Sequence, residues 1–211
     1  MRLDGAIVGS GERGVVLVHE AGVRVFCGWW PYAARLAARG FRVLIFDLRC
    51  YGLSDCPSSR RDDLVADVAA AVDELPGRGC SSIELVGASY GGSVALVAAA
   101  RLEEISAVAD LSGDEIGAPI GGEGRPLTAS KAAAGVHIPA LLALARDDGY
   151  IPLPDERAFF RRLGSSRKRL IVLPASAGHG WDLLVGVGSG GPWPRFERTL
   201  TALPRQAGSR S

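Results

Sequence analysis

The chain has 211 residues, of which 47% are hydrophobic and 22% charged, and its 24 basic residues nearly balance 23 acidic ones. This length suits one domain, for which ~100–200 residues is usual, and the apolar content excludes a chain that stays disordered for want of a core. A net charge of +1 argues against nucleic-acid binding, which needs a basic surface to neutralise phosphates. We expect a single domain over residues 1–205 and a disordered tail at 206–211.

Cysteine usage and hydropathy bear on the cellular compartment. No apolar run reaches the ~18–20 residues of a membrane span, and the first residues show no export signal. The cysteines are too few and too scattered for a disulfide framework, and none has a zinc-ligand spacing. These four residues are Cys27, Cys50, Cys56 and Cys80. We expect free thiols, no metal, no membrane partner and a cytoplasmic location.

Short β-branched runs alternate with helical patterns along the chain. The predicted strands are Val15–His19, Arg42–Asp47, Ser82–Gly87, Ile105–Leu111, Ala140–Ala145 and Lys168–Leu173. Most of them are continuously apolar, as strands covered on both faces are. Val15–His19 is expected to begin the sheet as an antiparallel hairpin with Ala6–Val8.

Helical patterns separate these strands. The predicted helices are Pro31–Arg39, Asp62–Leu75, Tyr90–Arg101, Pro154–Leu163 and approximately Pro194–Leu203. Strands that alternate with such helices predict an α/β fold of three layers, in which helices flank a mostly parallel sheet. Ser112–Val136 is rich in glycine and proline and is interpreted as a long loop.

Two glycine-rich segments imitate nucleotide-binding motifs. Gly9–Gly14 matches G-x-G-x-x-G, but a strand follows it at once, so no helix N-terminus is available to bind a phosphate. Gly186–Gly191 lacks the Lys-Ser/Thr pair of a P-loop. We interpret the first as a turn between strands and the second as a loop.

A stronger signal is the G-x-S-x-G sequence at Gly87–Gly91. An apolar strand ends at Gly87 and an Ala- and Val-rich helix follows, which is the strand–turn–helix context of a nucleophile elbow. Such a turn holds Ser89 in a strained conformation, and glycines on both sides avoid collisions across it. The first helical N–H, that of Tyr90, would then face an oxyanion formed beside the serine.

A serine nucleophile needs a base, and the sequence offers three histidines, at positions 19, 137 and 179. His179 is favoured because it lies on a glycine-flanked loop after the last clear strand. The imidazole needs a carboxylate to fix its tautomer, and Asp148, after the strand Ala140–Ala145, is favoured. Asp147 and Asp114 remain alternatives. The sequence therefore predicts a triad of Ser89, Asp148 and His179.

These residues, in this order and each after a strand, resemble the α/β-hydrolase fold over nearly the whole chain. Val16–His19 resembles the strand and turn that begin the oxyanion loop, and Trp30–Gly40 resembles the first helix. Phe46–Ser54 resembles the family motif D-x-R-G-x-G-x-S, and Ala145–Pro152 is similar to the motif of the acid. The short interval 112–136 leaves no room for a large cap, so the chain is similar to lidless dienelactone-hydrolase-like and small serine carboxylesterase enzymes.

Two positions depart from the pattern of the family, because Glu20 and Cys50 stand where glycine is usual. Glu20 follows His19, which we expect to be structural, and lies in the oxyanion loop. The resemblance implies Tyr90 N–H and Ala21 N–H as oxyanion donors, with the N–H of Glu20 as an alternative to the second. A carboxylate here would also repel anionic substrates.

The expected function is cleavage of a small ester or related acyl compound through an acyl-enzyme intermediate on Ser89. Glu20, Trp29 and Trp181 are the candidate substrate-binding residues, since tryptophans 29, 30 and 181 flank the predicted catalytic loops. No cofactor is required, and a monomer or homodimer acting on a small-molecule acyl substrate is expected. The alternatives are a peptidase, amidase or thioesterase with the same triad, and an inactive hydrolase-fold binding protein.

Overall fold

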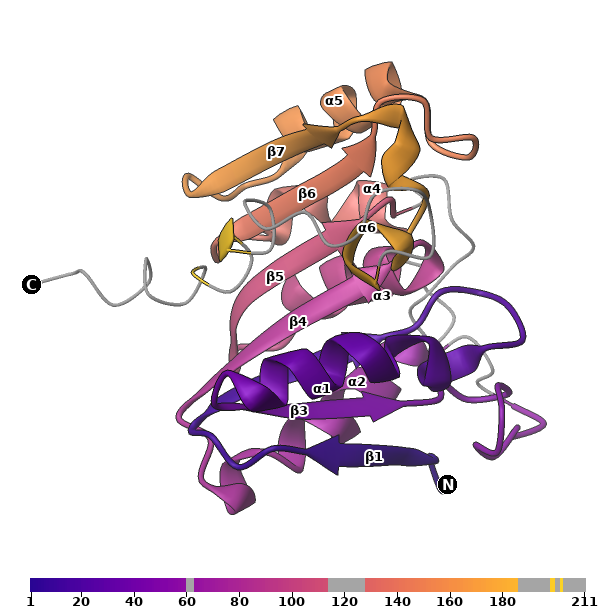
Figure 1. Cartoon of the computed structure of the whole chain (residues 1–211), viewed down its shortest axis with the longest axis vertical. Helices are drawn as coiled ribbons and strands as arrows, with labels where there is room; N and C mark the ends of the chain where they lie inside the picture. The colour runs from indigo at the N-terminus through magenta and orange to yellow at the C-terminus, as the bar shows by residue number, and fades with distance from the viewer. Residues whose placement is uncertain (60–62, 114–127, 186–197, 200–201, 203–211) are drawn as a thin grey trace, which may run out of the picture.

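The computed structural model describes residues 1–59, 63–113, 128–185, 198–199 and 202. Within these ranges the strands form one seven-stranded sheet in the order β1-β3-β2-β4-β5-β6-β7, which Figure 1 shows side by side. The strands are β1 (Gly5–Val8), β2 (Arg13–Val18), β3 (Phe41–Phe46), β4 (Ser82–Ala88), β5 (Ile105–Leu111), β6 (Ala140–Ala145) and β7 (Lys168–Leu173). All neighbouring strands are parallel except β1 and β3.

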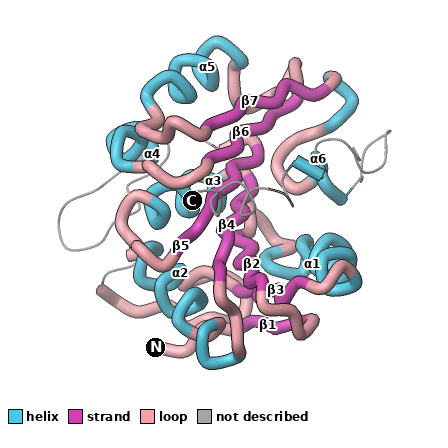
Figure 2. The backbone as a smooth tube through the Cα atoms, turned by 90° about the vertical axis from the view of Figure 1, so that its left-hand side faces the viewer, coloured by secondary structure: helices cyan, strands magenta, loops and turns pink. Residues whose placement is uncertain are grey.

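Helices cover both faces of this sheet, as Figure 2 shows with the sheet seen edge-on. The helices are α1 (Trp30–Ala38), α2 (Leu64–Asp73), α3 (Tyr90–Ala99), α4 (Ala129–Ala132), α5 (Leu153–Arg162) and α6 (Asp182–Val185), with 3-10 turns η1 (Val25–Trp29), η2 (Pro76–Arg78), η3 (Ala133–Gly135) and η4 (Ala175–Ala177). Helices α1 and α6 lie on one face and α2 to α5 on the other. The predicted three-layer α/β fold is confirmed. No helix in the described part of the chain is long and apolar enough to cross a bilayer.

The two apolar layers explain why the central strands are continuously hydrophobic. In β2, Val15 and Leu17 pack with α1 and α6, whereas Val16 and Val18 pack with α2 and α3. Successive side chains of a strand point to opposite faces, so a strand covered on both faces needs an apolar residue at every position.

The predicted hairpin between residues 6–8 and 15–19 is wrong. Strand β1 pairs with β3 in antiparallel register, with Gly5 opposite Phe46, and β2 lies between β3 and β4. The apolar pattern identifies the strands but not their neighbours, and β3 offers β1 an edge because β2 already has a partner on each side. The segment 9–14 is a turn into β2, as expected, and no helix follows it.

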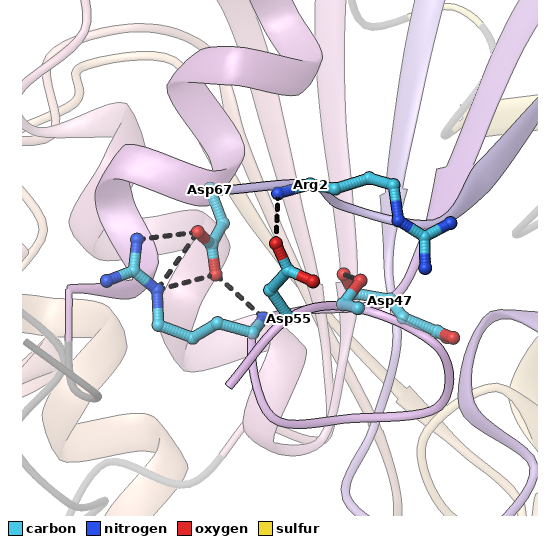
Figure 3. A network of polar contacts seen from close by, with 6 residues as sticks. Arg2, Asp47, Asp55 and Asp67 are labelled. Atoms are coloured by element: carbon cyan, nitrogen blue, oxygen red, sulfur yellow. Dashed lines mark hydrogen bonds and ion pairs between the residues drawn. The ribbon is translucent and has the colours of Figure 1, made fainter. Parts of the chain in front are cut away.

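The loop after β3 is fixed by a buried network, part of which Figure 3 shows. Asp67 of α2 accepts bonds from Arg49 at its backbone N–H (2.9 Å), at Nε (3.0 Å) and at a terminal guanidinium nitrogen (2.6 Å). Asp47 accepts the N–H of Phe26 at 2.9 Å, and its carbonyl accepts the hydroxyl of Ser54 at 2.6 Å. Charge-assisted bonds of this kind are strong where water is excluded, so the D-x-R-…-S residues define the shape of the loop.

The same loop contains a disulfide between Cys50 and Cys56, which corrects the prediction of free thiols. Among the described residues, Cys27 and Cys80 are free. Cys50 has a φ of 65° and donates its N–H to the carbonyl of Asp55 at 3.1 Å, so the chain turns back on itself here. Spacing along the sequence does not reveal such a turn. The bridge also removes the support that cysteine usage gave to a reducing compartment.

A carboxyl group, that of Glu84, is buried near the amino ends of strands β2 and β4. Glu84 of β4 is 3% exposed, and its carboxylate pairs with Arg13 of β2 at 3.0 Å. The Arg13 guanidinium also lies 4.2 Å from the centre of the Phe41 ring. Burial raises the pKa of Glu84 to about 7, against the opposing effect of Arg13.

This raised pKa predicts a pH-dependent stability. Between its ordinary pKa of 4.5 and about 7, folded Glu84 holds a proton that the unfolded chain releases. Glu84 therefore contributes fully to the free energy of unfolding below its unfolded-state pKa. This contribution, roughly 2–3 kcal/mol, is lost as the pH rises through the folded-state pKa. Urea unfolding of wild type and Glu84→Gln at pH 5 and pH 8 measures it. The wild-type free energy of unfolding should fall relative to the variant, and parallel curves would contradict the prediction.

Candidate active site

Ser89 occupies the turn between β4 and α3, where its backbone is strained. Its φ of 50° and ψ of −121° are rare for a residue with a side chain, and its N–H donates to the carbonyl of Leu111 at 2.8 Å. A Cβ at Gly87 would overlap the carbonyl oxygen of Gly91, and a Cβ at Gly91 would overlap the carbonyls that end β2. A side chain at either glycine of the G-x-S-x-G sequence would therefore collide with the backbone, as the sequence predicts. Glycine at both positions lets the helix approach the sheet, and the turn displays the serine.

The predicted oxyanion donors lie on two segments that pack together at this turn. Tyr90 is the first residue of α3, and Ala21 lies on the exposed loop after β2. Gly91 lies against the carbonyl oxygens of Val18 and His19, so the first turn of the helix abuts the start of that loop. The backbone N–H groups of a helix N-terminus favour negative charge. The role of Tyr90 N–H and Ala21 N–H as oxyanion donors stays a prediction.

His19 is a structural residue, as expected. It is fully buried, its Nδ1–H donates to the carbonyl of Glu20 at 2.7 Å, and its Nε2 accepts the N–H of Leu48 at 3.1 Å. These partners require the neutral tautomer. Burial lowers the pKa of His19 despite the backbone bond to Glu20 and the charge of Asp47, which act in the opposite direction.

The structure brings Asp148 and His179 together. The Nδ1 atom of His179 lies 2.8 and 2.9 Å from the two carboxylate oxygens of Asp148, whose side chain is 0% exposed, against 20% for the imidazole. Asp148 also accepts the N–H groups of Tyr150 (2.9 Å) and Ile151 (3.2 Å). Burial would raise the pKa of Asp148, but the bonds from His179 and from Tyr150 N–H outweigh it and lower the pKa. The carboxylate is therefore ionised at neutral pH.

The other predicted partners lie elsewhere. Asp147 is exposed, and the carboxylate that bonds to the imidazole of His179 is that of Asp148. Asp114 lies outside the described residues, and His137 is an exposed residue before β6. Of the candidate acids in the described chain, the geometry thus selects Asp148.

The histidine loop adjoins the serine turn. A Cβ built on Gly180, next to His179, would lie 3.6 Å from the Cβ of Ala88, the residue before Ser89. Because Nδ1–H donates to Asp148, the Nε2 atom of His179 keeps its lone pair and can accept a proton. A hydroxyl, a base and a carboxylate therefore lie on loops at one rim of the sheet, which is an arrangement suited to acyl transfer.

The structure divides the predicted substrate-binding residues. Trp29 is 0% exposed and packs in the core against Tyr32 and Trp181, with ring centroids 6.1 Å apart, so its role in substrate binding stays a prediction. Glu20 and Trp181 do border a cavity of about 330 Å³. Its lining is Glu20, Ala21, Gly22, Val23, Arg24, Trp181 and Asp182. Within the described chain, no cluster of His, Cys, Asp and Glu has the geometry to hold a metal ion.

Sequence reasoning missed Tyr150. Its ring is 76% exposed and lies 4.5 Å from the His179 ring between centroids, while its N–H bonds to Asp148. The residue is two positions after Asp148 in a turn, where no periodicity indicates which way a side chain points.

A strained serine in a strand–turn–helix elbow and a hydrogen-bonded aspartate–histidine pair, both following parallel strands, are features of hydrolases built on a parallel sheet. A family model described as the alpha/beta hydrolase family matches residues 15–208, and the chain belongs to this family. A curated relative, mouse epoxide hydrolase 4, is 35% identical over 105 residues, which are 46% of this chain and 28% of that protein. The chain thus covers little more than a quarter of that relative.

Solved structures agree on the fold. An esterase from Pyrococcus furiosus is similar with a TM-score of 0.75 and 19% identity, over 98% of this chain and 93% of that one. A monoacylglycerol lipase from Paleococcus ferrophilus has a TM-score of 0.71 and 19% identity, and the match covers both chains completely. At this level of identity the likeness establishes the architecture.

The contact between α3 and the end of β2 predicts a large cost for any side chain at position 91. Gly91→Ala places a methyl group on two backbone carbonyls, so we expect a loss of at least about 2–3 kcal/mol in the free energy of unfolding. Gly77→Ala is the matched control, because a Cβ there meets nothing within 4 Å and should change stability by less than about 0.5 kcal/mol. Urea denaturation measures both. Equal stabilities of the two variants would show that the contact is not rigid.

Proposed function

We propose that this protein is a serine hydrolase that cleaves small carboxylic esters through an acyl-enzyme intermediate. The observation that carries the proposal is the double contact of His179 Nδ1 with the buried carboxylate of Asp148, on a loop adjoining the strained Ser89 turn. The similar esterase and lipase structures are compatible with it.

In the first half-reaction, Ser89 Oγ attacks the ester carbonyl while its proton passes to Nε2 of His179. The ionised Asp148 stabilises the imidazolium that forms, and the N–H groups of Tyr90 and Ala21 face the oxyanion. Each such donor contributes roughly 2.7–4 kcal/mol in comparable sites. Collapse breaks the bond to the leaving alcohol, which takes the proton from His179.

In the second half-reaction, water attacks the acyl group on Ser89 and gives its proton to His179. The new tetrahedral intermediate collapses, the proton returns to Ser89 Oγ and the carboxylic acid leaves. Every proton is carried by His179, so the proposed reaction requires no cofactor. The same steps serve thioesters and amides, and esters are proposed because alcohols leave more readily than amines.

Epoxide opening, which the name of the mouse relative suggests, fits Ser89 poorly. Attack of a serine hydroxyl on an epoxide carbon would leave an ether on the protein, and water cannot cleave an ether by addition to a carbonyl. Attack on an ester leaves an ester, which water does cleave. An inactive binding protein is disfavoured because it would have no need of an Asp148–His179 pair beside a strained serine.

Covalent labelling tests the proposal. A fluorophosphonate should add one adduct to Ser89 of the wild type, detectable by intact-mass and peptide mass spectrometry, and Ser89→Ala should not be labelled. Short p-nitrophenyl esters should be hydrolysed faster than matched acyl thioesters and aminoacyl anilides. An unlabelled, folded wild-type protein would refute the proposal.

Neighbouring aspartates offer a matched test of the acid. Asp148→Asn removes the charge that stabilises the imidazolium, so kcat for a short ester should fall about 10³–10⁴-fold. Asp147→Asn changes an exposed carboxylate one residue away and should stay within about 2-fold of wild type. Steady-state kinetics on both variants decide, and equal rates would exclude Asp148 from the reaction.

A further inference from the structure

Glu20 stands where the resembling family usually has glycine, and its main chain is tied down. The carbonyl of Glu20 accepts the Nδ1–H of buried His19 at 2.7 Å. The residue is half-buried and lies one position before Ala21 in the loop after β2. The main chain at Glu20 is therefore restrained by a buried side chain.

The carboxylate of Glu20 reaches the histidine loop, at residues 178–181. Its Oε2 atom accepts the N–H of Trp181 at 3.4 Å. The same oxygen fills the space beside Gly180 that a side chain would occupy, because a Cβ built on Gly180 would overlap it. The carboxylate thus touches both residues that follow His179 in the chain.

The far side of this loop is held by packing. The indole of Trp181 lies against Gly28 and meets the ring of Trp29 edge to face, with centroids 6.1 Å apart. The carbonyls of His179 and Trp181 accept backbone N–H groups of the turn that follows, at 3.0 and 2.8 Å, and Glu20 adds a contact from the loop after β2. Two segments therefore meet at the carboxylate, the loop after β2 and the histidine loop, and Gly180 of the latter also adjoins Ala88 at the end of β4.

The charges around Glu20 act in both directions, and its pKa is raised overall. Burial raises the pKa of Glu20, the bond from Trp181 N–H and the charges of His179 and Arg24 lower it, and Asp182 raises it. Glu20 and His179 therefore attract each other whenever the imidazole is protonated.

We infer that Glu20 is a positioning residue that clasps the histidine loop to the loop bearing the second oxyanion donor. The clasp keeps the imidazole of His179 and the N–H of Ala21 at a fixed separation, so that proton transfer and oxyanion binding occur in one geometry. The inference rests on the proposed ester hydrolysis. It gives a role to a residue that departs from the usual glycine.

The test separates the acceptor oxygen from the charge. Glu20→Ala removes both and should lower kcat for a short p-nitrophenyl ester about 10–100-fold, with KM changed less than about 3-fold. Glu20→Gln keeps an acceptor oxygen and the shape of the side chain, and should retain kcat within about 3-fold of wild type. The exposed Glu74, at the C-terminal end of α2, pairs with Arg78 on the surface, so Glu74→Ala is the matched control and should match wild type.

Gly180→Ala attacks the same contact from the other side. The added methyl group displaces the carboxylate of Glu20 and should lower kcat with Glu20 intact. In the Glu20→Ala background the same change should cost less, since the strain of a φ of 57° is common to both backgrounds and only the collision is removed. An equal loss of kcat from Gly180→Ala in the two backgrounds would show that the contact between Gly180 and Glu20 does not affect the reaction.

Fluorophosphonate labelling distinguishes failure of the proposed ester hydrolysis from failure of the Glu20 clasp. A wild type that is not labelled refutes the proposed function. A labelled wild type with Glu20→Ala equal to it in labelling rate and kcat overturns the clasp alone. Loss of kcat in Glu20→Gln as large as in Glu20→Ala also overturns it, because the charge and not the acceptor would then matter. Thermal unfolding by circular dichroism checks that each variant is folded.

Discussion

The geometry of the site depends on one steric constraint, the contact of α3 with the ends of β2 and β4. Without side chains at positions 87 and 91, the helix begins directly against the backbone of both strands. Ser89 is held at a φ of 50° between these contacts, and its N–H bonds to the carbonyl of Leu111. The same contact puts the first helical N–H groups next to the loop after β2. One packing arrangement therefore fixes the serine and the surroundings of the proposed oxyanion together.

The other half of the site is built by polar contacts rather than by close packing. Asp148 is buried, yet it receives the imidazole of His179 and two backbone N–H groups, so its negative charge is fully hydrogen-bonded. A buried carboxylate without such partners would be costly and would take up a proton. The backbone N–H groups of the turn after β6 therefore stabilise the charge of Asp148, and the ionised carboxylate in turn orients His179.

Sequence reasoning succeeds where the physical cause is local. Strands β5, β6 and β7 have the predicted bounds because each is a short segment dominated by apolar residues, and G-x-S-x-G predicts its turn because the glycines are needed there. Asp148 and His179 can be predicted as partners because each follows a parallel strand, and parallel strands end at one rim of the sheet. The failures depend on how the folded chain brings residues together, which apolar patterns and residue spacing do not encode. β1 pairs with β3 across some forty residues, and Cys50 meets Cys56 because the loop between them turns back.

The disulfide lies in a loop whose ends are already held. Asp47 and Arg49 anchor its start through Phe26 and Asp67, and Ser54 returns to Asp47 before the second cysteine is reached. A bridge that encloses so few residues restricts the unfolded chain only modestly, by about 2–3 kcal/mol on the entropic view. Reduction would therefore loosen the outer bend and leave the inner hydrogen bonds in place. The loop can keep its fold in surroundings of either redox character, with the sulfur–sulfur bond acting as reinforcement.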